Sequence, residues 1–369
     1  MDEHEIIEKL KRLRSEDPSF RDGRILSSVS TEPLPVALKA FRIFSDTNAL
    51  DTNIFPSVQK IEREVIEWFG KLLKNPGISG YITTGGTEAN IMALLSAKKL
   101  YPGRDEIIVP ESAHYSIMRA SELMNLEIIW IKVDKNFRAD ANLIKDKINR
   151  DTLAVIATAG TSSLGIVDPI KEISELCEDV FFHVDAAFGG FVIPFMGKGK
   201  LDFSIENIDS MTIDPHKMGH SPIPAGAILF RDESYMDKLE FSPSYIPVKT
   251  KTLSGSRSGG SIASVWATIK YLGVNGYKRI VNECMKNTEF LCSEVEKIDS
   301  VSLITKPDLN VVGIKIPDPE KVWNSLKERG WKVSLNSDTK SLRIVVMPHV
   351  TKDVIMRFIS DLKEILRVT

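Results

Sequence analysis

The chain has 369 residues, too many for one small core, so two or three packed units are expected. Hydrophobic residues make up 43% and charged residues 27%, and the net charge of −2 gives no basis for binding nucleic acid or an acidic membrane surface. Three cysteines without metal-ligand spacing, no signal-like N-terminus and no apolar run near the ~20 residues of a membrane span predict a soluble, cytoplasmic protein without structural disulfides or metal.

Two amphipathic helices are predicted near the N-terminus. Apolar residues recur at helical spacing over 2–14 and over 58–74. The first helix ends at Asp17-Pro18, because the residue before a proline disfavours the α region. The segment between the helices contains two irregular stretches rich in turn residues. We therefore treat 1–57 as an N-terminal segment whose loops connect helices or line a pocket.

From Gly80 to about Arg231, short β-rich runs alternate with helical patterns. The predicted strands are 107–110, 126–133, 152–158, 180–184, 210–214 and 225–231, and the predicted helices are 87–100, 115–124, 139–149 and 168–178. This alternation predicts a mostly parallel sheet covered on both faces, within a large domain over 58–275. Ligands bind such sheets beyond the carboxyl ends of the strands.

The last third of the chain predicts a smaller domain over 276–369. A glycine-rich stretch at 255–261 precedes a long helical region over about 262–298. The predicted strands after it are 301–306, 310–316, 331–335 and 342–347, and the predicted helices are 319–329 and 351–367. This order is typical of a small α+β domain.

The motif TTGGTEAN at 83–90 predicts a site for an anion. Two glycines end a strand, and Thr87 opens a helix with Glu88 in its first turn. Free N–H groups at a helix start attract anions, and glycine lets the backbone approach them closely. An ordinary helix start with a threonine cap fits the same pattern.

The motif HVDAAFGG at 183–190 places Asp185 directly after an apolar strand, among small residues that leave room for a flat ring. A buried carboxylate is costly unless a cation pairs with it, and the protonated nitrogen of a pyridine ring would be such a cation. A turn-capping aspartate is the alternative.

The motif SMTIDPHKMGH at 210–220 places Lys217 after a strand and a proline turn, at the same edge as Asp185. A lysine kept from water can form a Schiff base with a carbonyl, and His216 could donate to a phosphate. A solvated surface lysine is the ordinary alternative. The conjunction of all three motifs favours an enzyme that uses pyridoxal phosphate (PLP).

Together, TTGGTEAN, HVDAAFGG and DPHKMGH resemble the motifs of the group II PLP-dependent amino-acid decarboxylases. The likeness is greatest to the archaeal tyrosine/aspartate decarboxylases linked to methanofuran and coenzyme A synthesis, and it runs over nearly the whole chain, including RIVVMPH at 343–349. It implies an α/β architecture with the aspartate aminotransferase-like fold (fold type I). It also implies decarboxylation of an L-amino acid, with aspartate (to β-alanine) and tyrosine (to tyramine) favoured.

The resemblance also implies roles around the cofactor. Lys217 would carry PLP, Asp185 would pair with its ring nitrogen, and the ring would lie between His114 and Ala187. The phosphate would be held by Gly86, Thr87 and His216, with Thr161 near the phenolic oxygen. The phosphate of a neighbouring subunit would be reached by Ser254, Gly255 and Ser256, so a homodimer with composite sites is expected. A flexible glycine-serine linker is the alternative for this stretch.

Two further residues have predicted roles toward the substrate. Arg343 lies on an apolar predicted strand, and its planar fork suits a substrate carboxylate, although an edge-strand arginine facing water fits too. Tyr245 lies in a stretch with two prolines and poor periodicity, which indicates a mobile active-site loop. Tyr245 could supply the proton that replaces CO₂, and Lys217 and His114 compete for that role. An exposed tyrosine on a loop without such a role fits the sequence equally well.

Other functions stay open on the sequence alone. Glutamate decarboxylation fits the motifs, and so does carbon–carbon cleavage of the sphingosine-phosphate-lyase type. A non-catalytic PLP-binding protein would leave Arg343 and the predicted loop without a purpose. A nucleotide site is disfavoured because no G-x-G-x-x-G follows a strand and no P-loop is present. Sulfur transfer is disfavoured because the cysteines at 177, 284 and 292 fall in helical patterns.

Overall fold

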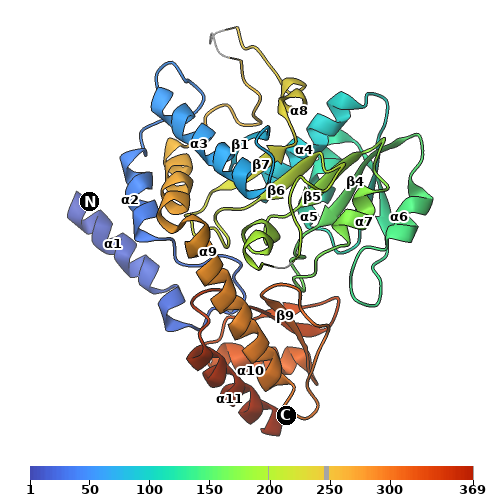
Figure 1. Ribbon diagram of the computed structural model, residues 1–369. Coiled ribbons are helices and arrows are strands. Elements are labelled where there is room, and N and C mark those ends of the chain that lie inside the picture. Colours follow the sequence, from blue (N-terminus) through green and yellow to red (C-terminus); the bar gives the residue numbers. More distant parts are fainter. Residues whose placement is uncertain (198, 245–248, 369) are drawn as a thin grey trace. The chain divides into compact units, whose positions relative to one another are not determined.

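The computed structural model describes residues 1–197, 199–244 and 249–368, and the chain divides into two compact units (Figure 1). The larger unit comprises Glu32–Asn282 and Pro307–Leu309. The smaller unit comprises Met1–Thr31, Glu283–Lys306 and Asn310–Thr369. These units are defined by contacts, whereas the predicted division into 1–57, 58–275 and 276–369 follows the order of the sequence and stays a prediction.

The larger unit is built on a seven-stranded sheet in the order β1-β7-β6-β5-β4-β2-β3. Its strands are β1 (Ser79–Thr83), β2 (Glu106–Pro110), β3 (Glu127–Ile131), β4 (Thr152–Thr158), β5 (Phe181–Asp185), β6 (Ser210–Ile213) and β7 (Gly226–Phe230). Neighbouring strands from β6 to β3 are parallel, and β7 runs antiparallel to both β6 and β1. The predicted mostly parallel sheet is therefore confirmed, with β7 as its reversed strand.

Helix α4 (Gly86–Leu100) packs against β1 and against the central strands β4 to β7. Its buried residues include Ala89, Ala93 and Ala97, whose small side chains let the helix lie close to the sheet. The other helices of this unit are α2 (Pro35–Ile43), α3 (Pro56–Leu72), α5 (Tyr115–Met124), α6 (Ala141–Lys147), α7 (Ile170–Ser174) and α8 (Glu233–Asp237). Helices α2 and α8 lie where the sequence predicts no element, and α7 is shorter than the predicted 168–178.

The smaller unit is an α+β structure, as predicted. Its antiparallel sheet has the order β10-β11-β9-β8, formed by β8 (Ser302–Leu303), β9 (Val311–Lys315), β10 (Ser334–Asn336) and β11 (Ser341–Val345). Its own helices are α1 (Glu3–Ser15), α10 (Pro319–Glu328) and α11 (Lys352–Val368). Helix α9 (Gly259–Val295) begins in the larger unit and has a kink at Gly273, where φ is 55°. No described helix combines the length and the apolar character that crossing a membrane requires.

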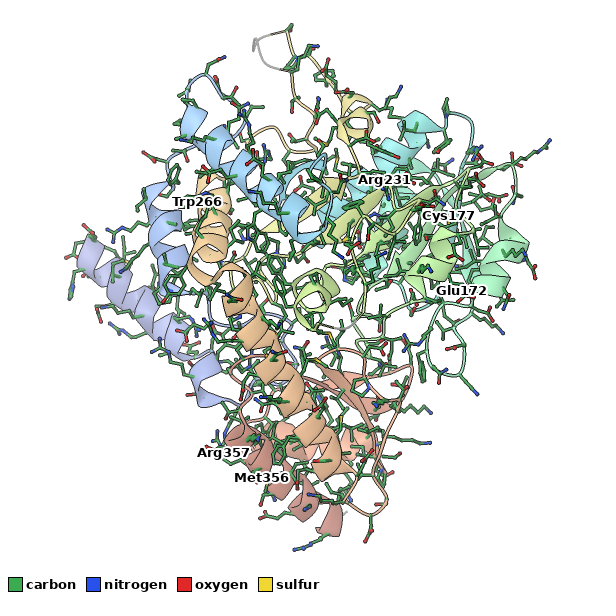
Figure 2. All side chains as sticks on the ribbon, viewed as in Figure 1. Glu172, Cys177, Arg231, Trp266, Met356 and Arg357 are labelled. Atoms are coloured by element: carbon green, nitrogen blue, oxygen red, sulfur yellow. The ribbon has the colours of Figure 1, made fainter. Side chains whose placement is uncertain are left out.

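The three cysteines are unpaired; Cys177 and Cys284 are buried, and Cys292 is half-buried. Cys177, which Figure 2 labels, lies just beyond the end of α7, and the other two lie on α9. Burial raises the pKa of Cys177, that of Cys284 to about 12 and that of Cys292 to about 11. The thiols are therefore protonated near neutral pH, as expected of packing residues rather than nucleophiles.

A methyl group at Gly226 would disturb the turn after β1. Gly226 pairs with Thr83, and a Cβ there would stand 2.5 Å from the Gly85 Cα and 2.4 Å from the Thr83 hydroxyl. We expect Gly226→Ala to lower the free energy of unfolding by about 1–3 kcal/mol, the usual cost of overpacking. Urea denaturation measures this, with Gly77→Ala as control because its nearest contact would be 3.4 Å away. Equal stability of the two variants would contradict the close packing of this turn.

His183 on β5 should make the protein sensitive to acid. It is fully buried between the Ser210 hydroxyl at 2.8 Å and the Asn90 amide oxygen at 2.9 Å, and burial lowers its pKa from 6.5 to about 4. The unfolded chain therefore binds a proton first as the pH falls. The stabilisation present above pH 6.5 is lost on the way down to about pH 4.

The matching variant is His183→Gln, which keeps a donor and an acceptor but does not titrate. Between about pH 7.5 and about pH 5, it should lose about 2 kcal/mol less of its free energy of unfolding than the wild type. His220, whose pKa burial also lowers to about 4, contributes equally to both proteins. Denaturant titrations of the two cofactor-free proteins with parallel pH dependence would show that His183 is not the titrating group.

Candidate active site

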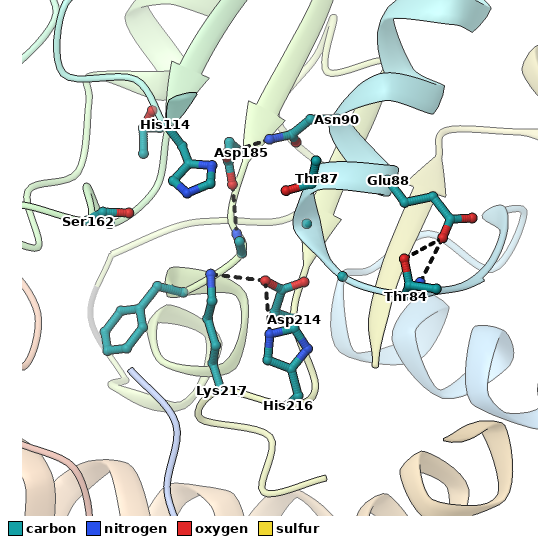
Figure 3. Close-up of a pocket in the computed structure, with 16 residues that line it drawn as sticks. Thr84, Thr87, Glu88, Asn90, His114, Ser162, Asp185, Asp214, His216 and Lys217 are labelled. Atoms are coloured by element: carbon teal, nitrogen blue, oxygen red, sulfur yellow. Dashed lines mark hydrogen bonds and ion pairs between the residues drawn. The ribbon is translucent and has the colours of Figure 1, made fainter. Parts of the chain in front are cut away.

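A cavity of about 310 Å³ lies where β4, β5 and β6 end, beside the first turn of α4 (Figure 3). This volume is near the lower end of the roughly 300–1,000 Å³ typical of ligand pockets. The cavity is lined by Thr84, Gly85, Gly86, Thr87, Glu88, Asn90, His114, Thr158, Gly160, Ser162, Asp185, Ala187, Phe188, Asp214, His216 and Lys217. The expected position beyond the carboxyl ends of the strands is thus the position of the cavity.

The first turn of α4 forms a cradle on one side of the cavity. Its N-cap is Gly85, and no side chain caps the helix, so the threonine cap considered from the sequence is not formed. A Cβ at Gly86 would stand 3.0 Å from an Asp214 oxygen and 3.3 Å from the Ala187 Cβ, so a larger residue would fill the cradle. A turn of this kind, with its N–H groups and the helix dipole, suits a phosphate group.

Asp185, the last residue of β5, is 5% exposed and points its carboxylate into the cavity wall. One carboxylate oxygen accepts the Ala187 backbone N–H at 3.0 Å, and the other accepts the Asn90 side-chain amide at 2.9 Å. Among the residues that the structure describes, no cationic side chain forms an ion pair with Asp185. A buried carboxylate with only neutral donors suits a cation such as a protonated ring nitrogen.

Lys217 lines the cavity, and its amine forms an ion pair with Asp214 that the sequence did not predict. Its Nζ lies 2.9 Å from an Asp214 oxygen, and the other Asp214 oxygen is buried with no hydrogen-bond partner in the described structure. Figure 3 shows Asp214 between Lys217 and His216, whose Nε2 lies 3.7 Å away. The Lys217 amine is therefore oriented by a carboxylate three residues earlier in the same turn.

His216 and His114 are both held as neutral rings. Burial lowers the pKa of each, although nearby carboxylates oppose the shift. His216 Nδ1 donates to the Ala225 carbonyl at 2.6 Å, so its Nε2 could donate to a phosphate only after gaining a proton. His114 is the N-cap of α5, with Nδ1 2.8 Å from the Ser116 hydroxyl.

The structure brings most of the predicted residues to one cavity, but it leaves Thr161 outside the lining. The Thr161 hydroxyl accepts the Ile166 backbone N–H at 3.1 Å, and its neighbours Gly160 and Ser162 form the wall instead. The predicted residues that do line the cavity are Gly86, Thr87, His114, Asp185, Ala187, His216 and Lys217, and their roles toward a cofactor stay predictions.

The residues predicted to serve a neighbouring subunit are not among those that line this cavity. The Ser254 carbonyl accepts the Thr252 hydroxyl at 2.8 Å, the Ser256 hydroxyl accepts the Asn48 amide at 3.1 Å, and Gly255 is exposed. Their role toward a second subunit stays a prediction.

Two predicted substrate residues also stay predictions. Arg343 belongs to the smaller unit, where it donates to the Ser27 carbonyl at 2.9 Å, and burial lowers its pKa to about 10. Tyr245 lies outside the described residues.

The sequence analysis gives no role to two residues that shape the cavity, Asn90 and Asp214. Both stand inside the quoted motifs, but their residue types are equally common in caps and turns. The available signal was spacing. Asp214 precedes Lys217 by one turn, and Asn90 follows Gly86 by one helical turn, so both side chains return to the face of the functional residue.

These observations fit PLP. The α4 turn would hold the phosphate, Asp185 would hold the ring nitrogen, and Lys217 would carry the cofactor. The Asp214 oxygen that has no partner in the described structure also leaves a hydrogen-bond acceptor in the cavity wall for a bound group.

Comparisons with known proteins agree with this fit. Residues 43–316 match the family model described as the pyridoxal-dependent decarboxylase conserved domain. The chain is 45% identical to a probable L-tyrosine/L-aspartate decarboxylase of Methanocella arvoryzae, over 99% of this chain and 98% of the relative. It is 39% identical to an L-aspartate/L-glutamate decarboxylase of Pyrococcus horikoshii, over 98% and 97%.

Among solved structures, a sphingosine-1-phosphate lyase of Burkholderia pseudomallei matches with a TM-score of 0.93 and 25% identity, over 100% of this chain and 91% of that chain. The expected fold type I architecture, the PLP cofactor and the class of enzyme, a PLP-dependent amino-acid decarboxylase, are thereby confirmed. The cavity and the family match lead to one conclusion: this chain belongs to the pyridoxal-dependent decarboxylase family.

Proposed function

We propose that the protein removes the α-carboxyl group of L-aspartate, L-tyrosine or both, with Lys217 as the residue that carries PLP. The observation that carries this proposal is the convergence of the Lys217 amine, the Asp185 carboxylate and the first turn of α4 on one cavity. The products would be β-alanine or tyramine, which suit coenzyme A and methanofuran synthesis respectively.

The choice of substrate rests on the relatives. The Methanocella relative is named for tyrosine and aspartate, and the Pyrococcus relative is named for aspartate and glutamate. Aspartate is common to both names, so it is the first substrate to test. Glutamate is the alternative within the same reaction.

In the proposed reaction, some residues of the chain would stabilise the charges of the cofactor and others would supply a proton to the product. When bound, PLP supplies an electron sink for the electrons that CO₂ leaves behind. Asp185 would place its carboxylate beside a protonated ring nitrogen in a site sheltered from water. The first turn of α4 would hold the phosphate and so fix the orientation of the ring.

Lys217 would hold the proton needed after CO₂ loss. Its Nζ is 2.9 Å from Asp214, so amine and carboxylate can exchange a proton without solvent. His114 also lines the cavity, and Tyr245 remains a proposed proton donor. We further propose a homodimer in which Ser254, Gly255 and Ser256 contact the neighbouring subunit's phosphate.

A second candidate reaction is carbon–carbon cleavage of a phosphorylated amino alcohol. The observation that favours it is the TM-score of 0.93 with a sphingosine-1-phosphate lyase. The two reactions differ in products, since only decarboxylation releases CO₂.

The first experiment offers aspartate, tyrosine and glutamate separately to the purified protein with PLP. We expect CO₂ and amine in equal amounts from aspartate, tyrosine or both, and a fall of at least about a hundred-fold in Lys217→Ala because the amine that handles the proton is lost. The absorption band of bound PLP should be altered in the same variant. A protein that binds PLP at Lys217 but releases no CO₂ from any of the three would exclude the proposed reaction.

Arg343→Lys tests the proposed contact with the substrate carboxylate. A lysine keeps the charge but loses the planar fork, so KM should rise about ten- to a hundred-fold with kcat changed less. Arg357→Lys, an exposed change in the same unit, serves as the control. Steady-state kinetics with the preferred substrate gives both constants, and an unchanged KM in Arg343→Lys would remove Arg343 from the substrate site.

A further inference from the structure

Asn90 stands at the centre of a buried hydrogen-bond network that reaches two cavity residues. Its amide nitrogen donates to Asp185 at 2.9 Å and to the Ser116 hydroxyl at 2.8 Å. Its amide oxygen lies 2.7 Å from the Thr212 hydroxyl and 2.9 Å from His183 Nε2. An asparagine side chain can donate twice and accept twice, so this amide uses its full capacity.

The direction of the network follows from charge. An ionised carboxylate can only accept, so the NH₂ group of Asn90 must face Asp185, and the amide oxygen must face the opposite side. His183 Nε2 then donates to Asn90, and His183 Nδ1 accepts from Ser210. Rotating the amide by half a turn would set its oxygen against the carboxylate and leave no donor for it.

The same amide contributes, together with the Ser116 backbone N–H, to which nitrogen of His114 carries a proton. The Ser116 oxygen accepts from Asn90, so the hydroxyl proton is free to point at His114 Nδ1, 2.8 Å away. The Ser116 backbone N–H also points at that nitrogen, at 3.3 Å. With Nδ1 an acceptor, the proton of the neutral ring lies on Nε2.

We propose that Asn90 is a positioning residue that sets two properties of the site through one amide group. It keeps the Asp185 carboxylate as an acceptor, and through Ser116 it keeps His114 as a ring with its proton on Nε2. Figure 3 shows Asn90, Asp185 and His114 around the same part of the cavity. His114 therefore offers a hydrogen-bond donor to an anionic group such as a substrate carboxylate. The inference rests on the proposed cofactor contact of Asp185.

The network has two arms: the hydrogen bond from Asn90 to Asp185, and the hydrogen bonds from Asn90 through Ser116 to His114. The test compares three variants that remove different arms. Asn90→Asp replaces the donors with a carboxylate, which must share a proton with Asp185, so both arms are lost. Ser116→Ala removes only the arm to His114. Thr212→Val removes one hydrogen bond to the same amide but leaves both donors in place, and it is the matched control.

Two measurements read the arms separately. The dissociation constant of PLP reports on Asp185, and we expect it to rise about ten-fold or more in Asn90→Asp, and to stay within about three-fold of wild type in the other two variants. Nitrogen NMR of the cofactor-free protein with labelled histidine rings reports on His114, whose signals are assigned with His114→Asn among the six histidines. In Asn90→Asp and Ser116→Ala, the shifts of the two His114 nitrogens should move toward one another.

An unchanged dissociation constant in Asn90→Asp, or unchanged His114 shifts in both Asn90→Asp and Ser116→Ala, would overturn the proposal. Equal losses of PLP affinity in Asn90→Asp and Thr212→Val would reduce Asn90 to a packing role and overturn it too. If Asn90→Asp does not fold, the His114 shifts of Ser116→Ala decide. A wild-type protein that does not bind PLP through Lys217 would instead contradict the proposed function, while the NMR measurement on the cofactor-free protein would still test the network.

Discussion

An ionised carboxylate can stay out of water only where other groups replace the water, and Asp185 imposes this requirement on the larger unit. Asp185 is the last residue of β5, which pairs with β4 on one side and with β6 on the other. Its donors come from the turn that follows the strand and from helix α4. The Ala187 N–H and the Asn90 amide fill these two positions. The two donors are neutral, so the carboxylate has no positive charge beside it among the described residues, which suits a cationic ring.

The packing of α4 follows from the same requirement. Asn90 reaches Asp185 only because α4 presents small residues to the sheet and lies close to it. Its first turn then stands at the strand ends, and Gly226 on β7 leaves the room that this turn needs. One helix thus supplies both the cradle for an anion and the donor for a carboxylate.

Residue patterns were sufficient to predict the sheet, the smaller α+β unit and the cavity residues that follow strands, such as Lys217 and Asp185. Alternation of apolar strands and helices is a local signal, and its consequence for ligand position is general. The contacts of Asn90 to Asp185 and Ser116 depend on how α4 lies against the sheet, which no local pattern encodes. The pair of Asp214 and Lys217 is local, but an aspartate in a turn is too common to indicate an ion pair by itself. Thr161 was expected near the phenolic oxygen of the cofactor. In the structure its hydroxyl accepts the Ile166 N–H, and its neighbours Gly160 and Ser162 line the cavity.

The strand order has a consequence for how the protein folds. Asp185 and Lys217 follow different strands of the sheet, and Asn90 and Lys217 are separated by 217 − 90 = 127 residues. Contacts between such distant segments form late, because their closure costs the most chain entropy. The cavity can exist only once β1 and the strands from β4 to β7 have assembled. A newly made chain can therefore bind the cofactor only after the central sheet has formed. Binding would then stabilise the folded chain relative to the unfolded chain.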